Sequence, residues 1–147
     1  MRDFIVRTAI AAPPQTVWPI LADLERWPEW TASMQSVTRL DAGALGTGSR
    51  VRVAQPKLRP AVFTITEWQP ERNFTWASST PAVRATAGHL LEPSATGCDL
   101  VLRLRFEGWA GGLAGWLMRD LVERYMAMEG EGLKQRSEAA AGAAPPA

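Results

Sequence analysis

The segment DLVLRLRFE, residues 99–107, has the clearest structural pattern in the chain. Leu100, Leu102, Leu104 and Phe106 are apolar, whereas mostly charged residues occupy the positions between them. Strict alternation is typical of a strand in an antiparallel sheet that buries one face and exposes the other. The segment therefore predicts an antiparallel sheet whose apolar face is covered by another layer.

Six further strand-like segments precede it, separated by glycine, proline and other turn residues. They are residues 4–10, 37–40, 49–54, 61–68, 74–78 and 83–92. Two short helices are predicted between the first two strands. One begins at the prolines of residues 13–14, and the other lies within residues 25–30.

A long amphipathic helix is predicted after the strands, over about residues 113–136. Its apolar face carries Met118, Leu121, Val122, Tyr125, Glu129 and Leu133. The glycine-rich residues 108–112 before it form either a hinge that places Trp109 near a pocket or a loose connection. Residues 138–147 are almost entirely Ala, Gly and Pro, so we expect a disordered tail after a single domain of residues 1–137.

This order of elements predicts an α+β fold. A curved antiparallel sheet wraps around the long C-terminal helix, and the two short helices close one end. If the sheet and helix stand apart, the space between them is a cavity; if they close tightly, it is only a core.

Composition limits the function classes. The formal net charge of the 147 residues is +1, which gives no electrostatic basis for binding nucleic acid. No window is long and apolar enough to span a membrane, and Asp3 and Arg7 interrupt any N-terminal leader. The single cysteine, Cys98, cannot form an internal disulfide. We expect a cytoplasmic protein, and the abundance of Arg and Ala suggests a bacterial one.

The segment DLERWPEW, residues 23–30, places two tryptophans on a connection that is normally polar. Trp27 and Trp30 flank a proline and form a stiff apolar elbow beside the sheet. Rings of this size need something to pack against, so the elbow predicts a covered hydrophobic pocket.

Several short motifs resemble, in their order and spacing, the START-like or SRPBCC superfamily, especially its bacterial polyketide cyclase/dehydrase branch. They are Ala12-Pro13-Pro14 with Val17-Trp18, Asp23 with Trp27-Pro28-Glu29-Trp30, Gly48 and the strand after it, Thr66-Glu67-Trp68-Gln69-Pro70, Phe74-Thr75-Trp76, His89-Leu90-Leu91-Glu92-Pro93, and Tyr125 with Gly132-Leu133-Lys134. The resemblance implies a helix-grip fold, like that of Bet v 1, with a deep hydrophobic pocket between sheet and helix. Members of the superfamily bind lipids, polyketides, hormones or quinones, and only some are enzymes.

We predict that the pocket wall is made of inward-facing residues of the elbow, strands and long helix. They are Trp27, Trp30, Val51, Val53, Phe63, Ile65, Trp76, His89, Leu102, Leu104, Met118, Leu121, Val122 and Tyr125. The strand at residues 61–68 leaves its register open, because Val62, Thr64 and Thr66 are the alternative inner face.

His89, Tyr125 and Glu129 are the candidates for proton transfer. His89 points inward if it shares a face with Ala85 and Ala87, whereas the other register would bury Arg84 instead. Glu129 lies on the apolar face of the long helix, where a carboxylate can act as an acid or anchor a ligand. The alternatives are that Glu129 is solvated or paired with Arg136, and that Tyr125 only packs the core. The lone histidine makes a poor metal centre, and we expect neither metal nor cofactor.

Three functions remain open. The first is binding of a small hydrophobic molecule, lipid-like or polyketide-like, without turnover, which the sequence favours. The second is a polyketide cyclase or dehydratase that uses His89, Tyr125 or Glu129. The third is a protein-interaction module, which requires an exposed apolar patch that the sequence does not reveal. A homodimer is compatible with all three.

Overall fold

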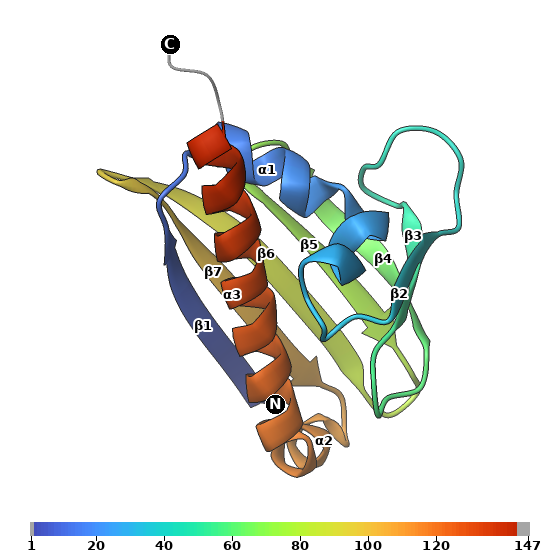
Figure 1. Cartoon of the computed structure of the whole chain (residues 1–147). Helices are drawn as coiled ribbons and strands as arrows, with labels where there is room; N and C mark the ends of the chain where they lie inside the picture. Colours follow the sequence, from blue (N-terminus) through green and yellow to red (C-terminus); the bar gives the residue numbers. More distant parts are fainter. Residues whose placement is uncertain (1, 144–147) are drawn as a thin grey trace.

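A curved antiparallel sheet grips one long helix in the computed structural model, which describes residues 2–143 (Figure 1). The strands are β1 (Arg2–Ile10), β2 (Ser36–Arg39), β3 (Arg50–Ala54), β4 (Ala61–Gln69), β5 (Asn73–Ser79), β6 (Arg84–Ser94) and β7 (Gly97–Glu107). The helices are α1 (Pro14–Ala22), the 3-10 helix η1 (Leu24–Glu29), α2 (Gly111–Leu117) and α3 (Arg119–Ala143). The predicted α+β arrangement is confirmed.

The seven strands follow the order β1-β7-β6-β5-β4-β3-β2, and every neighbouring pair is antiparallel. The predicted faces of β7 are confirmed, because Leu100, Leu102 and Phe106 are buried while Arg103 is exposed. Leu102 lies between Val6 of β1 and His89 of β6 in the register of the sheet. The inner face of β6 therefore carries the histidine.

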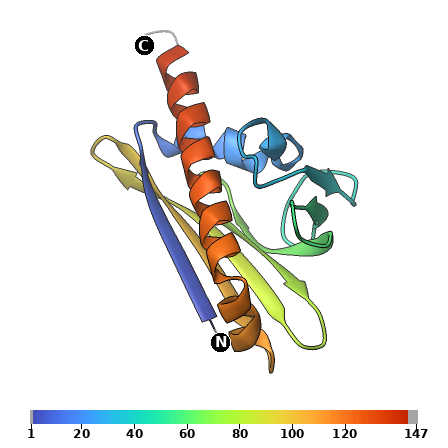
Figure 2. The same cartoon turned by 60° about the horizontal axis from the view of Figure 1, so that its bottom comes forward.

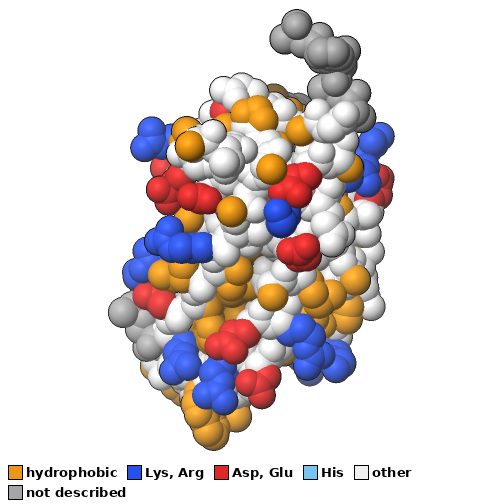
Figure 3. Space-filling view, turned by 60° about the vertical axis from the view of Figure 1, so that its left-hand side comes forward, with side chains coloured by type: hydrophobic (Ala, Val, Ile, Leu, Met, Phe, Trp, Pro, Cys, Tyr) orange, Lys and Arg blue, Asp and Glu red, His pale blue; other side chains and the backbone are white. Residues whose placement is uncertain are grey.

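The single long helix predicted at residues 113–136 is two helices in the structure. Met118 separates α2 from α3 with φ −98° and ψ 4°, outside helical values. The glycines of α2 pack closely against Phe106 and Arg2 at the end of the sheet. Figure 3 shows hydrophobic side chains gathered at the lower tip of the molecule, the end at which α2 lies in Figure 1.

The predicted disordered tail is wrong for residues 138–143, because α3 continues to Ala143. Alanine favours helix strongly, and the Glu138 carboxylate accepts a hydrogen bond from the Ala11 backbone amide at 2.8 Å. That amide and then the Lys134 ammonium lower the pKa of Glu138. Residues 144–147 of the predicted tail lie outside the described residues.

Two glycines bring α3 against the rest of the protein. A Cβ atom on Gly130 would lie 2.7 Å from the Thr8 hydroxyl of β1, and one on Gly132 would overlap the Trp30 carbonyl oxygen. A side chain at either position would separate the helix from its support. In Figures 1 and 2, α3 runs beside β1, whereas α1 and η1 lie over the upper part of the strands farther from β1.

Replacement of Gly132 by alanine tests this close approach. Ala is normally the better helix former, but here its Cβ meets the Trp30 carbonyl. We expect Gly132→Ala to lower the free energy of unfolding by about 2–3 kcal/mol, as overpacked sites do. Gly142→Ala is the matched control, because nothing lies within 4 Å of its Cβ. Urea denaturation that ranks the two variants equally would contradict the close approach.

Candidate functional site

A cavity of about 340 Å³ lies between the inner face of the sheet and the first turns of α3. Its floor comes from β3 to β7, one side comes from α3, and the β3–β4 and β5–β6 connections form its rim. The cavity exists because α3 leans on β1 at Gly130, while its earlier turns carry large side chains. Its volume is at the lower end of the ~300–1,000 Å³ range of small-molecule sites.

Most of the predicted wall residues lie on this cavity. They are Val53, Phe63, Trp76, His89, Leu102, Leu104, Met118, Leu121, Val122 and Tyr125. Val62 is exposed, so the register that places Phe63 inward is the one the chain adopts. These residues come from distant parts of the sequence and are brought together by the curvature of the sheet.

Trp27, Trp30, Val51 and Ile65 are absent from the cavity wall, in contrast to the prediction. Val51 and Ile65 are fully buried in the closed core, farther along the inner face of β3 and β4. Trp27 lies in the core, and Trp30 is half-buried against it, because α3 closes over the elbow at Gly132 instead of standing away from it.

The two elbow rings differ in how they are held. The Trp27 indole donates to the Leu21 carbonyl at 2.8 Å and is completely buried. Its ring centroid lies 5.3 Å from that of Trp76 and 5.4 Å from that of His89. The Trp30 indole N–H has no acceptor within residues 2–143. Trp27 does not line the cavity, but it packs against Trp76 and His89, which do, and so holds them in position.

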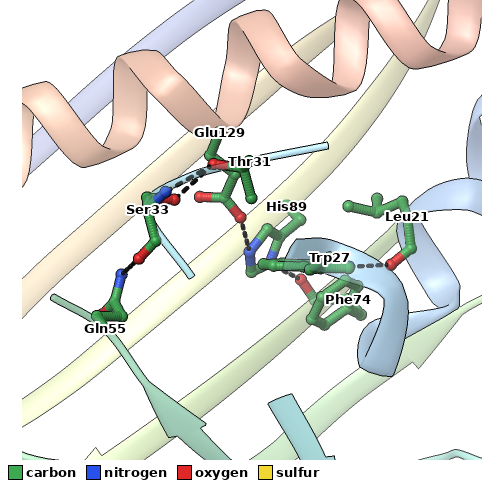
Figure 4. Close-up of polar contacts among 8 residues, drawn as sticks. All are labelled: Leu21, Trp27, Thr31, Ser33, Gln55, Phe74, His89 and Glu129. Carbon is green, nitrogen blue, oxygen red and sulfur yellow. Dashed lines mark hydrogen bonds and ion pairs between the residues drawn. The ribbon is translucent and has the colours of Figure 1, made fainter. Parts of the chain in front are cut away.

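His89 is buried in an aromatic cluster and fixed in orientation. Its Nδ1 lies 3.1 Å from the Phe74 carbonyl oxygen, and its ring stacks on Phe74 with centroids 4.1 Å apart. A carbonyl oxygen only accepts, so Nδ1 carries the proton and Nε2 faces away from the strand. Figure 4 shows His89 between the Phe74 carbonyl and Glu129.

Glu129 faces this Nε2 from α3. The distance from His89 Nε2 to Glu129 Oε1 is 3.4 Å, beyond the usual range of a hydrogen bond. Oε1 is buried and has no hydrogen-bond partner in the described chain. Arg136 pairs with Glu29 at 2.8 Å, so the alternative of a Glu129–Arg136 pair is wrong. The histidine and the carboxylate thus form a buried pair, in which the two groups face each other on the cavity wall.

Tyr125 lines the cavity one helical turn before Glu129, but its hydroxyl donates to the Pro56 carbonyl of the β3–β4 connection. The phenol therefore fastens α3 to the rim. Its proton is engaged by the protein, which weakens the prediction that Tyr125 transfers protons.

Sequence reasoning missed several wall residues. Met126 follows Val122 by one helical turn, and this spacing identifies it. Met34, Gln55, Leu58 and Arg59 lie on connections that have no periodic signal. Gln55 also donates to the Ser33 carbonyl at 3.3 Å, which ties one side of the rim to the segment after η1.

Within residues 2–143, no helix is both long and apolar enough to cross a membrane. No group of three or more His, Cys, Asp and Glu side chains in this part of the chain is arranged to hold a metal ion.

A helix gripped by a curved sheet over a partly apolar cavity defines the helix-grip class of proteins. Residues 1–138 match the family described as polyketide cyclase / dehydrase and lipid transport, and the chain belongs to that family. No curated protein matches the chain by sequence.

Solved structures share the fold. The Zhui aromatase/cyclase from Streptomyces sp. R1128 is 20% identical, with a TM-score of 0.78 over 99% of both chains. A protein from Thermus thermophilus is 24% identical, with a TM-score of 0.69 over 95% of this chain and 99% of that one. Ara h 8.0201 is 13% identical, with a TM-score of 0.73 over 94% and 98%. The chain also spans about half of two di-domain aromatase/cyclases, BexL (46%) and StfQ (52%).

Trp27→Phe tests the supporting role of the elbow. The smaller ring leaves a void and removes the donor of the Leu21 carbonyl, so we expect a loss of about 2 kcal/mol or more in the free energy of unfolding. Trp30→Phe removes no hydrogen bond and is expected to cost less. Thermal and urea unfolding measure both effects. An equal or larger loss in Trp30→Phe would contradict this account of the elbow.

Proposed function

We propose that the protein binds a small, largely apolar, planar molecule in the cavity between the sheet and α3. The observation that carries the proposal is the cavity itself, with aromatic walls and one buried polar pair. Phe63 and Trp76 lie with their ring centroids 5.2 Å apart on its floor, where a flat ligand can pack against them.

The polar end of the cavity orients the ligand. Glu129 Oε1 lacks a partner, and His89 Nε2 lies beyond hydrogen-bond range of it. When the pair holds a proton on one of these two atoms, a ligand hydroxyl that lies against both accepts from the protonated atom and donates to the other. Burial of roughly 300 Å² of apolar ligand surface contributes on the order of 7 kcal/mol. That free energy alone corresponds to a dissociation constant of about 10 μM, so the polar contacts at this end are needed to offset the cost of ordering the ligand.

Filling the cavity tests binding. Ala87 lies on the cavity floor, on the inner face of β6 between Ala85 and His89. We expect Ala87→Trp to occupy the space and weaken binding of the fluorescent probe 1-anilinonaphthalene-8-sulfonate at least ~10-fold. Thr86→Trp is the matched control, because it places the same side chain on the opposite face of β6. Equal affinity in both variants would place the probe elsewhere. Native mass spectrometry of the wild-type protein identifies any ligand that copurifies.

The buried His89–Glu129 pair favours a second candidate function, a cyclase or dehydratase. In such a dehydration, Nε2 of His89 takes a proton from the carbon next to a carbonyl group. The electrons of that C–H bond form the new double bond. The β-hydroxyl group leaves as water with the proton of Glu129. Transfer of the proton from His89 to Glu129 then restores the pair, so no other reactant is needed. Family membership supports this candidate, and the structure supplies the two groups it requires.

Substitution of the pair separates turnover from binding. We expect Glu129→Gln to reduce dehydration of a β-hydroxy ketone ~10²–10⁴-fold while the fold is kept, because the amide cannot deliver the proton. Tyr125→Phe is expected to affect turnover far less, since its phenol is engaged by Pro56. Ultraviolet absorbance of the conjugated product measures the rate. Full turnover in Glu129→Gln would eliminate this mechanism and leave the binding function standing.

A further inference from the structure

The short helix α2 and Trp109, two residues before it, expose a contiguous group of apolar side chains, which we call the α2 knob. The exposed fractions are 86% for Trp109, 59% for Leu113, 61% for Trp116 and 67% for Leu117. Other large apolar residues that are exposed in the described chain are scattered over the surface. Two tryptophans and two leucines on one tip are unusual for a solvent-facing surface and mark a site of contact.

The inner face of α2, opposite the knob, is packed tightly against the end of the sheet. A Cβ atom on Gly115 would lie 2.6 Å from the side chain of Arg2, and one on Gly111 would lie 2.9 Å from the backbone of Phe106. These glycines pack the inner face of α2 tightly onto the end of the sheet. The apolar side chains are therefore fixed outward and cannot turn in to cover themselves.

The knob adjoins the cavity. Met118 follows α2 directly and lines the cavity. The Ala110 amide donates to the Ala82 carbonyl at 3.1 Å, and Val83, the next residue, lines the cavity as well. Trp109, the neighbour of Ala110, is thus held near the cavity rim, although the tight packing of Gly111 and Gly115 gives no hinge there. A surface that receives the knob would also face the rim of the cavity.

The small area and convex shape of the knob favour a lipid bilayer over a protein as its binding partner. A stable protein interface buries ~800 Å² on each partner, more than four side chains around a seven-residue helix provide. The knob projects as a convex tip (Figure 3), which suits insertion into a soft layer. Tryptophan prefers the interface between lipid headgroups and acyl chains, and leucine prefers the acyl chains below it. Arg119 beside the knob pairs with Asp120 at 3.4 Å, and Arg2 adds a positive charge behind α2.

We propose that the α2 knob inserts into the surface of a lipid bilayer and holds the cavity rim against it. A molecule that fits an apolar cavity is poorly soluble in water, and the bilayer is where it accumulates. The insertion rests on the knob alone. The transfer of a ligand between bilayer and cavity rests on the proposed binding function.

Cosedimentation of the full chain with phosphatidylcholine vesicles tests the insertion. We expect the wild-type protein to pellet with the vesicles, and the double variant Trp109→Ser/Trp116→Ser to lose at least ~10-fold in partition coefficient. Leu113→Ser/Leu117→Ser is a second variant with the same expectation. Ile5→Ser/Val62→Ser is the matched control, because both residues are exposed and apolar but lie on the outer face of the sheet. Circular dichroism verifies that each variant is folded.

The remaining outcomes are also decisive. Binding that persists from ~0.1 to ~1 M salt supports insertion of apolar side chains, because salt screens charge attraction. Absence of wild-type binding, or an equal loss in the control variant, overturns the proposal. So does a dimer in solution that Trp109→Ser/Trp116→Ser dissociates without any vesicle binding. Ala87→Trp is expected to keep vesicle binding while it loses the cavity probe, so the two proposals fail separately.

Discussion

The structure depends on the close approach of α3 to its support at Gly130 and Gly132. The absence of side chains there lets the helix backbone reach the Thr8 hydroxyl and the Trp30 carbonyl. Beyond this contact, Arg136 and Glu138 fasten the helix to Glu29 and to the Ala11 amide. One half of α3 is therefore held against β1 and the elbow. The earlier turns, which carry large side chains, stand away from the sheet, and the cavity lies beneath them.

The same arrangement orders the site. Trp27 fills the closed half of the interior and packs its ring against His89, which stacks on Phe74. The Phe74 carbonyl fixes the proton on Nδ1, so the other ring nitrogen is directed to Glu129 on the helix. The position of the His89–Glu129 pair is thus set by three parts of the structure: the elbow, the sheet and α3. Binding and dehydration need the same geometry and differ in whether the pair exchanges a proton with its ligand.

The sequence predicted those features that depend on local periodicity. Alternation along β7 identified the buried face of Leu100, Leu102 and Phe106, and the same reasoning placed His89 inward on β6. Prediction from the sequence failed where two secondary-structure elements pack against each other. Trp27 and Trp30 were expected on the cavity wall, yet the helix closes over them because Gly132 permits it. The exposed tryptophans of the α2 knob also escaped prediction, since nothing local distinguishes an apolar residue that packs inside from one that faces water.

The amino-acid sequence by itself determined the α+β class, the strand faces, the helix that covers them and the family to which the chain belongs. Each of these follows from the side-chain repeat of about 3.6 residues in a helix and 2 in a strand, together with the turn residues. All of these signals act within a few neighbouring positions. Only the tertiary structure decided that the interior is partly hollow, that His89 meets Glu129, and that the Tyr125 hydroxyl is engaged by Pro56. These depend on how far a helix stands from a sheet, and that distance is set by contacts between residues far apart in the chain.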